Sequence, residues 1–564
     1  MNKIKSIFNK IWKNKFLPYI IIIMLGILIC MPLFRMTLNK YNEFRIHIGR
    51  VVSIREVLKD GIFPPYISYK HMNNFGYALN IFYGVLTTYI PILISLITGS
   101  CILALKLFTI LVVILSGITM YKFAYEITNR KLPSLITALV YMAAPYKFCD
   151  IYSRNAVGEY TAFVFIPMVF QGIYQLLNDN KKGNYYLVIG ASLLVLSHTI
   201  TTIYTVIFAI LFLLFNFKKL KNKTVWKYFI IDGLLIIILT AFYMVPILEH
   251  KMAAKYVIYD EDRMGTSGVY VYTDENTNNP LQWFMLETRT GLNFSFGVVI
   301  TILIISTIFT YKHLDKKLKD IYGTCWILSI ISLIMCTKIF PWMIMPQFLT
   351  IIQFAWRING FFILFISIVC GINAWILTEK VLKNNYAIPI FIIITIFIMS
   401  GISGFNYATK NYSRESEDKF EEKIIDASSI GPFNINRDYM PLRALDNIQY
   451  LQQRKNISIL MDGNAIIENE SKNKLHDEFE VSKVNNAKIE LPYLYYCGYT
   501  VKLNGKEIKN HESKNGFVEV EINENGKIEV DYTGTKIEKA GMIISALGLI
   551  GCMGYLLANK KKAT

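Results

Sequence analysis

Long apolar stretches recur through the whole 564-residue chain, and they constrain its fold more than any other feature. A helix needs about 20 apolar residues to cross the hydrocarbon core of a membrane. Composition agrees, because 53% of the residues are hydrophobic and 18% are charged. The sequence therefore predicts an α-helical polytopic membrane protein with about 12 transmembrane helices, and it excludes a soluble enzyme. The candidate spans are residues 16–34, 101–124, 132–147, 160–178, 184–198, 199–217, 228–247, 292–312, 321–337, 358–378, 387–404 and 540–558.

Basic residues are concentrated in short turns between these spans. A formal net charge of +18 in a soluble domain would suggest nucleic-acid binding, but lysine and arginine placed beside spans indicate cytoplasmic loops of a membrane protein. We therefore expect no nucleic-acid partner, and we place both termini in the cytoplasm. The basic turns are residues 3–15, 130–131, 181–182, 218–227, 312–319, 380–383 and 560–562.

The same charge rule decides two ambiguous apolar stretches. Residues 16–34 follow a basic head but lack a small-x-small cleavage site, so we expect a retained first span. Counting residues 78–99 as a span would put the later lysine-rich turns outside. We therefore predict that residues 78–99 dip into the outer leaflet or lie along it.

This topology predicts four segments on the outer side of a cell membrane, at residues 35–100, 147–159, 248–291 and 405–539. Polar groups near the bilayer are costly unless they are paired, so an active site is expected on this outer face. The predicted domains are a polytopic domain at 1–404 with a large first outer loop, an extracytoplasmic domain at 405–539, and a final helix with a basic tail at 540–564.

Residues 405–539 change character and predict a small extracytoplasmic β-rich domain. Residues 415–427 and 442–454 have helical patterns. Asn504-Gly505 is a hairpin signal of type I′. Apolar and polar residues alternate in four predicted strands, at residues 488–491, 500–503, 517–522 and 527–532.

Glu43, His47 and Arg50 share a predicted helix face just after the first span, because residues at i, i+4 and i+7 lie on one side of a helix. A carboxylate, an imidazole and a guanidinium on one face can support catalysis or phosphate binding. A solvated amphipathic face is the alternative interpretation.

The first outer loop continues with aromatic residues separated by proline and glycine turns, including Tyr66, Tyr77 and Tyr83. Aromatic rings offer flat surfaces for sugars, and they also line membrane interfaces without any ligand. We predict that these three tyrosines contact a substrate, with an interfacial aromatic belt as the alternative.

Arg154, Glu159 and Arg357 lie at the predicted outer ends of spans. A local ion pair or contacts with lipid headgroups would account for them singly. Together with Arg50, the two arginines suggest a clamp for a lipid-linked phosphate, because guanidinium binds phosphate in a bidentate fork.

Several common catalytic signatures are absent from the sequence, including GxxxxGK[ST], HExxH, CxxC, Gly-x-Ser-x-Gly and a GxGxxG after a strand. Nucleotide hydrolysis and ordinary serine or zinc hydrolysis are therefore not expected.

Several short patterns, taken together, resemble the bacterial YfhO-like membrane proteins, a branch of the GT-C superfamily of polytopic glycosyltransferases. The likeness covers nearly the whole chain. The patterns are Glu43-x-x-x-His47-x-x-Arg50; Phe63-Pro-Pro with Phe75-Gly-Tyr and Phe82-Tyr83; Tyr152-x-Arg154 with Glu159 and Pro167; Ile352-Gln-Phe-Ala-Trp-Arg357; Leu491-Pro-Tyr before Gly498-Tyr; Asn504-Gly-Lys506; and Tyr532-Thr-Gly-Thr535.

The resemblance implies transfer of a sugar from a polyprenyl-phosphate donor to an envelope glycan or teichoic-type acceptor on the outer face. Glu43 would be the base, although related sequences usually have aspartate there, and His47 would orient it or contact the donor. The resemblance leaves a divalent metal open and predicts no further cofactor. The implied ligands are Arg50, Arg154 and Arg357 for the phosphate, and Tyr66, Tyr77, Tyr83 and Glu159 for sugar or acceptor.

Two other function classes stay open at this point. A flippase-like transporter of lipids or oligosaccharides would also be polytopic with intramembrane arginines, although we find no internal symmetry of the kind transporters show. A non-catalytic scaffold that binds envelope glycan through its β-rich domain is the third class.

Overall fold

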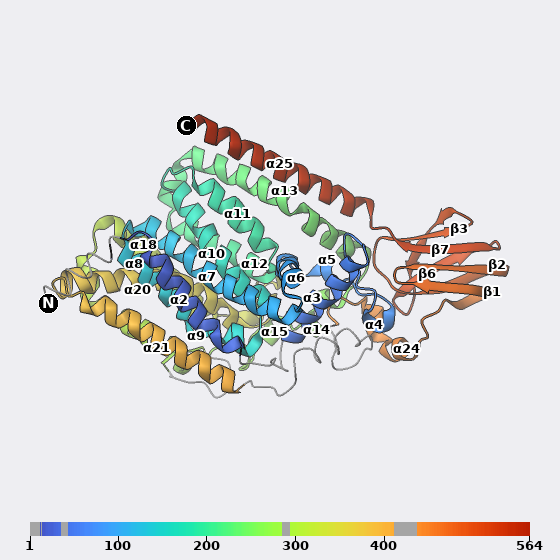
Figure 1. Ribbon diagram of the computed structural model, residues 1–564, viewed down its shortest axis with the longest axis horizontal. Helices are drawn as coiled ribbons and strands as arrows, with labels where there is room; N and C mark the ends of the chain where they lie inside the picture. The colour runs from blue at the N-terminus through green and yellow to red at the C-terminus, as the bar shows by residue number, and fades with distance from the viewer. Residues whose placement is uncertain (1–11, 13, 35–42, 285–293, 411–436, 564) are drawn as a thin grey trace. The chain divides into compact units, whose positions relative to one another are not determined.

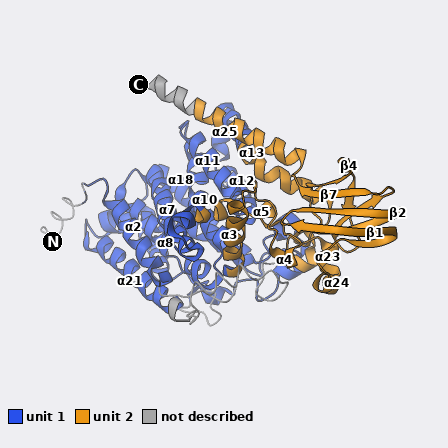
Figure 2. Cartoon of the chain, turned by 45° about the vertical axis from the view of Figure 1, so that its right-hand side comes forward, with its two compact units in different colours: residues 1–44, 93–236, 265–417 blue, residues 45–92, 237–264, 418–564 orange. Residues whose placement is uncertain are grey.

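The computed structural model describes residues 12, 14–34, 43–284, 294–410 and 437–563. The chain forms two compact units, drawn in blue and orange in Figure 2. The first unit contains residues 1–44, 93–236 and 265–417, and the second contains residues 45–92, 237–264 and 418–564. Each unit is built from three separate stretches of chain. The units therefore differ from the predicted domains, each of which is one continuous range of residues.

The first unit is a bundle of apolar helices (Figure 1). Helix α7 packs against α2, α8 and α10, while α20 packs against α8 and α18. Every residue of α20 is buried, as expected for a helix that is apolar on all sides. The principal helices are α2 (Leu17–Cys30), α7 (Cys101–Thr128), α8 (Lys131–Ala143), α10 (Val157–Leu176), α11 (Gly183–Val195), α12 (Thr199–Phe215), α16 (Val298–Ile305), α18 (Lys316–Met335), α20 (Asn359–Ile376) and α21 (Ala387–Lys410).

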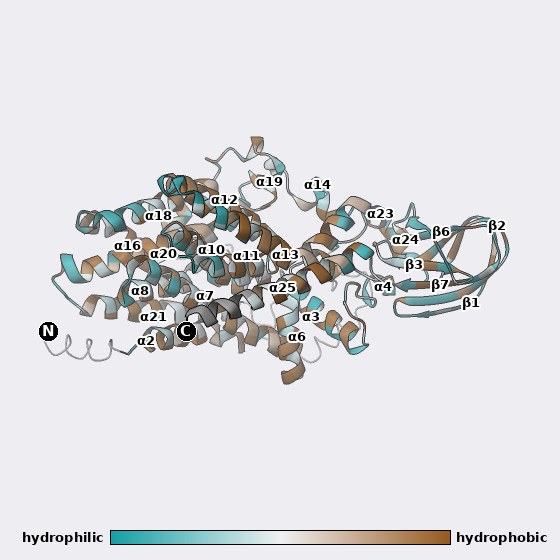
Figure 3. Cartoon of the chain, turned by 90° about the horizontal axis from the view of Figure 1, so that it is seen from above, coloured by the Kyte–Doolittle hydropathy of each residue, from teal (hydrophilic) through white to brown (hydrophobic). Residues whose placement is uncertain are grey.

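Seven described helical segments are long and apolar enough to cross a membrane. Two of them lie in α13 (Lys223–Ala253) and α25 (Lys536–Ala563). Shorter apolar helices coincide with further predicted spans, at α8, α11, α12 and residues 298–313. Figure 3 shows hydrophobic residues along α12 and α13 and hydrophilic residues along strands β1 and β2. The predicted fold class is thus confirmed, while the count of about 12 spans stays a prediction.

The apolar stretch at residues 78–99, which the sequence left ambiguous, divides into α5 (Leu79–Phe82) and α6 (Leu86–Thr98). The 13 residues of α6 rise about 20 Å, which is shorter than the hydrocarbon core of about 30 Å. Because α8 and α11 also have 13 residues each, length does not separate this stretch from the predicted spans, and its place in or along the outer leaflet stays a prediction.

The second unit contains an antiparallel seven-stranded sheet with the order β4-β3-β7-β2-β6-β5, and β1 pairs with β2. All four predicted strands are confirmed, and Asn504 and Gly505 have the positive φ angles of a type I′ turn. The strands are β1 (Ile459–Asn473), β2 (His476–Leu494), β3 (Tyr499–Leu503), β4 (Lys506–Ile508), β5 (Asn510–Glu512), β6 (Phe517–Ile522) and β7 (Gly526–Tyr532).

The predicted helix at residues 442–454 is confirmed as two short helices, α23 (Leu442–Asp446) and α24 (Ile448–Gln453). The predicted helix at 415–427 lies outside the described residues.

Aromatic residues of the predicted first outer loop belong to the core of this second unit. Phe75 packs edge-on against Phe517 of β6, and its carbonyl accepts a hydrogen bond from the Leu494 N–H at 2.9 Å. The ring of Phe82 stacks on Tyr439 with 5.4 Å between centroids. The loop is therefore held by the sheet domain through its aromatic side chains.

An ion pair buried completely within the second unit joins Arg454 to Glu490, with 3.0 Å between Nε and Oε1. Glu490 also accepts hydrogen bonds from Tyr450, Ser513 and Asn515. A buried charge pair is tolerated when its remaining hydrogen-bonding capacity is met, and this network meets that condition.

A buried aspartate in the sheet predicts a pH-dependent stability. Burial raises the pKa of Asp477 on β2 to about 7, and the nearby Glu470 adds to the rise. An unfolded aspartate titrates near about 3.9, so between pH about 4 and 7 only the folded chain holds this proton. The free energy of unfolding should therefore fall by up to about 4 kcal/mol as pH rises through that window.

Thermal unfolding of the detergent-purified protein between pH 4 and 8 measures this dependence. Asp477→Asn should flatten the profile, whereas Asp462→Asn at an exposed position of β1 should leave it unchanged. An equally steep profile in the Asp477 variant would assign the dependence to another group.

Candidate functional site

The segment after α8 turns sharply and brings ionisable side chains into the interior of the first unit. Pro145 opens the short helix α9 (Pro145–Phe148), and a π-helical turn η2 (Cys149–Arg154) follows. Asn155 then adopts the left-handed conformation, with φ of 54°, before α10 begins at Val157. π-Helical turns are rare and occur frequently at functional sites. Here the turn presents Asp150 and Arg154 toward the start of α10.

Arg154 lies between three carboxylates. Its Nη1 contacts Asp150 Oδ1 at 2.6 Å and Glu159 Oε2 at 2.7 Å, and its Nη2 contacts Glu43 Oε1 at 3.1 Å. The Glu43 N–H also donates to the Arg154 carbonyl at 3.1 Å. A pair of residues 111 positions apart in the chain is thus joined through both backbone and side chain.

A second arginine and an aromatic wall complete this cluster, which we call the Arg154 cluster. Arg357 Nε lies 3.7 Å from Glu159 Oε2. The hydroxyl of Tyr146 donates a hydrogen bond to Glu159 Oε1. The Arg154 guanidinium lies over the Trp356 ring, 4.5 Å from its centroid, an arrangement that favours the cation.

Exposure distinguishes the three carboxylates. The side chains of Asp150 and Glu159 are 0% and 4% exposed, whereas that of Glu43 is 31% exposed. Glu43 is therefore the carboxylate of the Arg154 cluster that a substrate can reach most readily.

Burial and neighbouring charge act differently on the two buried acids. Burial raises the pKa of Asp150 well above its usual range, and the charge of Glu159 raises it further. Burial also opposes ionisation of Glu159, but Arg154 and Arg357 outweigh it and lower the pKa of Glu159 below its usual value. The cluster therefore keeps Glu159 charged while favouring a protonated Asp150.

The structure gathers four of the predicted site residues in the first unit: Glu43, Arg154, Glu159 and Arg357. His198 is the N-cap residue of α12 and accepts a hydrogen bond from the Thr201 N–H at 3.3 Å. It lies close enough to Glu159 to interact with it electrostatically.

His47 and Arg50 belong to the second unit, on α3 (Phe44–Lys59). Arg50 is fully buried, and its guanidinium lies over the ring of Tyr83, 4.1 Å from the centroid. It donates to the Gly84 carbonyl at 3.0 Å and to the Thr87 hydroxyl at 3.3 Å. Arg50 thus has protein partners of its own, and its phosphate-binding role stays a prediction, as does the role of His47.

The three predicted substrate-binding tyrosines also lie in the second unit. Tyr77 is fully buried in the core, and its hydroxyl accepts a hydrogen bond from the Tyr439 N–H at 3.1 Å. That position gives Tyr77 a packing role, because a residue with no exposed surface offers no platform to a sugar. Tyr66 and Tyr83 are half-buried, and their contact with substrate stays a prediction.

Arg154 lies between Glu43, Asp150 and Glu159 and pairs with all three carboxylates. Carboxylates that already pair with a guanidinium do not form a ready-made metal site. Among the described residues, the group of His, Cys, Asp and Glu that satisfies the spacing of metal ligands is Glu249, His250 and Glu538 in the second unit.

The middle of the chain matches the model of a known protein family. The model described as "6-pyruvoyl-tetrahydropterin synthase related domain; membrane protein" matches residues 81–407, more than half of the chain. The chain belongs to this family. Membership of the pterin-synthase-related membrane family confirms the predicted relationship to YfhO-like membrane proteins.

One relative matches this chain over almost the full length of both proteins. An uncharacterized protein of Lactococcus lactis subsp. cremoris (strain MG1363) is 26% identical over 595 residues, which covers 97% of this chain and 96% of the relative.

Two solved structures of the oligosaccharyltransferase of Archaeoglobus fulgidus, one tethered to an acceptor peptide and one in the apo form, have TM-scores of 0.41 and 0.43. Each is 12% identical in sequence and covers 76% of this chain. The chain spans 61% and 62% of the lengths of these two structures.

Sequence reasoning missed Asp150, Tyr146 and Trp356 of the Arg154 cluster. A usable signal existed for Asp150, since it stands in the apolar run Phe148-Cys-Asp-Ile-Tyr152, four residues before Arg154. A carboxylate among residues that are usually buried requires a partner, and Arg154 supplies one.

Proposed function

We propose that this membrane protein is a glycosyltransferase that moves a sugar from a polyprenyl-phosphate donor to an acceptor hydroxyl of the cell envelope, on the outer face. The observation that carries the proposal is the partly exposed Glu43, held by Arg154 beside two buried acids. Support also comes from the predicted topology, which puts residues 35–100 and 147–159 on the same side of the membrane. The acceptor class is an envelope glycan or a teichoic-type polymer.

Glu43 acts as the general base in this scheme. The acceptor oxygen attacks the anomeric carbon of the donor, its proton passes to Glu43, and the bond from that carbon to the phosphate oxygen breaks. The lipid phosphate leaves as an anion, so strong protonation of the leaving group is unnecessary. The ion pair with Arg154 favours the ionised carboxylate that a base requires.

The two arginines of the cluster have different roles in this proposal. Arg154 directs Nη1 and Nη2 to the three carboxylates, so we assign it the positioning of Glu43. Arg357 donates through Nη1 to the Ile352 carbonyl and the Gln353 side chain. Its Nη2 makes no hydrogen bond or ion pair with the residues that the structure describes, and it is the donor we assign to the departing phosphate.

A hollow beside the cluster is suited to the lipid part of the donor. It lies between α7, η2 and α10, and its walls are mostly apolar, including Phe44 and Tyr152. Lys106 also lines it and provides a positive charge. An apolar groove next to a cationic group matches the chemistry of a lipid phosphate.

Substitution of Arg357 tests the phosphate role. Arg357→Lys keeps the charge but loses the planar fork, so kcat/KM for the lipid-linked donor should fall by about 10- to 100-fold. In Arg357→Gln this kcat/KM should fall further, because the positive charge is also lost. The measurement is the initial rate of transfer in proteoliposomes at varied donor concentration. Arg263→Lys, at an exposed ion pair with Asp446, is the control. Equal rates in the Arg357 variants and the control would show that Arg357 does not bind the donor phosphate.

A deletion strain tests the proposed function itself. Its envelope glycan profile should lack a sugar substituent that the wild-type gene restores, and the lipid-linked sugar should accumulate on the outer face. A transporter would instead cause accumulation on the inner face. A glycan-binding scaffold would leave the composition of the glycan unchanged. Either of these results would overturn the proposal.

A further inference from the structure

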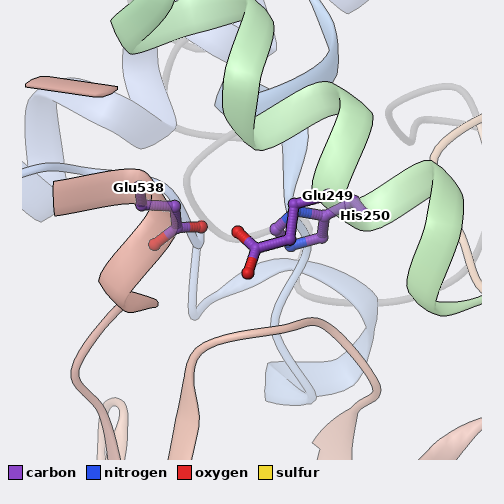
Figure 4. Close-up of side chains that lie close together, drawn as sticks. All are labelled: Glu249, His250 and Glu538. Atoms are coloured by element: carbon purple, nitrogen blue, oxygen red, sulfur yellow. The ribbon is translucent and has the colours of Figure 1, made fainter. Parts of the chain in front are cut away.

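Three potential metal ligands meet where α13 ends and α25 begins, within the second unit. Glu249 and His250 are consecutive residues near the C-terminal end of α13, and Glu538 lies in the first turn of α25. One ligand atom from each lies within 4.8 Å of the others. Figure 4 shows the imidazole of His250 and both carboxylates turned toward the same space.

His250 is prepared for ligation on one of its ring nitrogens. The residue is fully buried. Its Nδ1 lies 2.9 Å from the carbonyl of Pro246, one helical turn earlier, and that carbonyl can only accept, so Nδ1 carries the proton. Nε2 then has a lone pair. It makes no hydrogen bond of ordinary geometry with the described residues, although the backbone of Cys497 lies close enough to act on the imidazole. Histidine ligands of metals usually have this arrangement, with the second ring N–H donated to a carbonyl.

The two carboxylates are also held by the backbone and by a shared threonine. Thr535 and Glu538 form a capping box at the start of α25, in which the Thr535 N–H donates to Glu538 Oε2 at 2.8 Å and the Glu538 N–H donates to Thr535 Oγ1 at 2.9 Å. The Thr535 hydroxyl donates to Glu249 Oε2 at 2.6 Å. Glu538 is fully buried. Two acids brought this close repel each other unless a proton or a cation lies between them.

We infer that Glu249, His250 and Glu538 form a binding site for a divalent transition-metal ion, with Zn²⁺ the best fit. The imidazole nitrogen selects Zn²⁺ and its neighbours over Mg²⁺ and Ca²⁺, which prefer all-oxygen ligands. Two carboxylates supply the charge that a dication needs in a buried position. Three protein ligands leave a fourth tetrahedral position for water.

The bound ion joins two helices that are nearly 290 residues apart in sequence. Helix α25 follows β7 directly, so the ion fixes the last strand of the sheet to the end of α13. This role is independent of the proposed transfer reaction, since none of the three ligands belongs to the Arg154 cluster.

Metal binding can be measured on the full-length protein in detergent, after treatment with a chelator. Titration with Zn²⁺ should show one tight site per chain, and Zn²⁺ should raise the unfolding temperature. His250→Ala and Glu538→Gln should each weaken binding by more than about 100-fold. His511→Gln, on a half-exposed histidine paired with Glu519 in the same unit, should bind Zn²⁺ like the wild type.

A second measurement uses the unaltered protein and so does not depend on whether the variants fold. Co²⁺ added to the metal-free protein should give the visible absorption of a four- or five-coordinate site, and Zn²⁺ should displace it. Failure to bind one ion per chain tightly, or unchanged affinity in a folded His250→Ala variant, would overturn the inference. Neither result bears on sugar transfer, which is measured separately.

Discussion

Glu43→Gln should reduce the rate of sugar transfer by about 10²- to 10⁴-fold, the usual contribution of a general base. Glutamine keeps the size of the side chain and still offers an oxygen to Arg154, which lies 3.1 Å from the carboxylate. It cannot accept the proton of the acceptor hydroxyl. The fold should persist because the two buried acids continue to pair with Arg154.

The measurement is the transfer rate in membranes containing equal amounts of wild-type and variant protein. Glu275→Gln changes an exposed carboxylate of the same unit, and its rate should match that of the wild type. Wild-type activity in the Glu43 variant would exclude Glu43 as the base. A scaffold, in contrast, would tolerate the substitution in every envelope assay.

Arg154→Met should lower the free energy of unfolding by about 3–5 kcal/mol, because it leaves the charged, buried Glu159 without its closest partner. The methionine retains much of the apolar stem but removes contacts with three carboxylates and with the Trp356 ring. This loss should greatly exceed that of a surface ion pair, which contributes about 0–1 kcal/mol.

Thermal unfolding in detergent measures the effect, and Arg263→Met is the matched control, since Arg263 forms an exposed ion pair with Asp446. A triple variant, Arg154→Met with Asp150→Asn and Glu159→Gln, should recover part of the lost stability, because the unpaired charges are removed. If the single variant were as stable as the control, Arg154 would not be what holds the buried acids in place.

The helices could be predicted because hydropathy is a local property of the sequence. The predicted span at residues 101–124 corresponds to α7, and that at 358–378 corresponds to α20. Strand β1 was missed because polar residues occupy both of its faces, as in Glu468-Asn-Glu-Ser-Lys472, and period-two alternation is then absent. The pairing of β1 with β2 comes from the sheet and not from its own pattern.

Only part of the candidate site could be predicted, because its residues are joined by contacts between distant parts of the chain. Helical spacing placed Glu43, His47 and Arg50 on one face, but it could not identify the partner of Glu43, which lies 111 residues further along the chain. The sequence grouped Arg357 with Arg50 and Arg154 in a phosphate clamp and gave Glu159 a substrate-binding role, but it did not pair Glu159 with Arg357. Their contact with one another depends on tertiary packing, and a local sequence pattern cannot predict such a contact.

The interleaved construction of the second unit sets the order in which this protein can be completed during synthesis. Residues 45–92 are made about 330 residues before the chain that begins at 418, which corresponds to a delay on the order of half a minute at typical translation rates. During that interval Phe75 and Phe82 lack the partners Phe517 and Tyr439. Residues 45–92 therefore acquire their final packing only after the segment that carries Tyr439 and Phe517 has emerged.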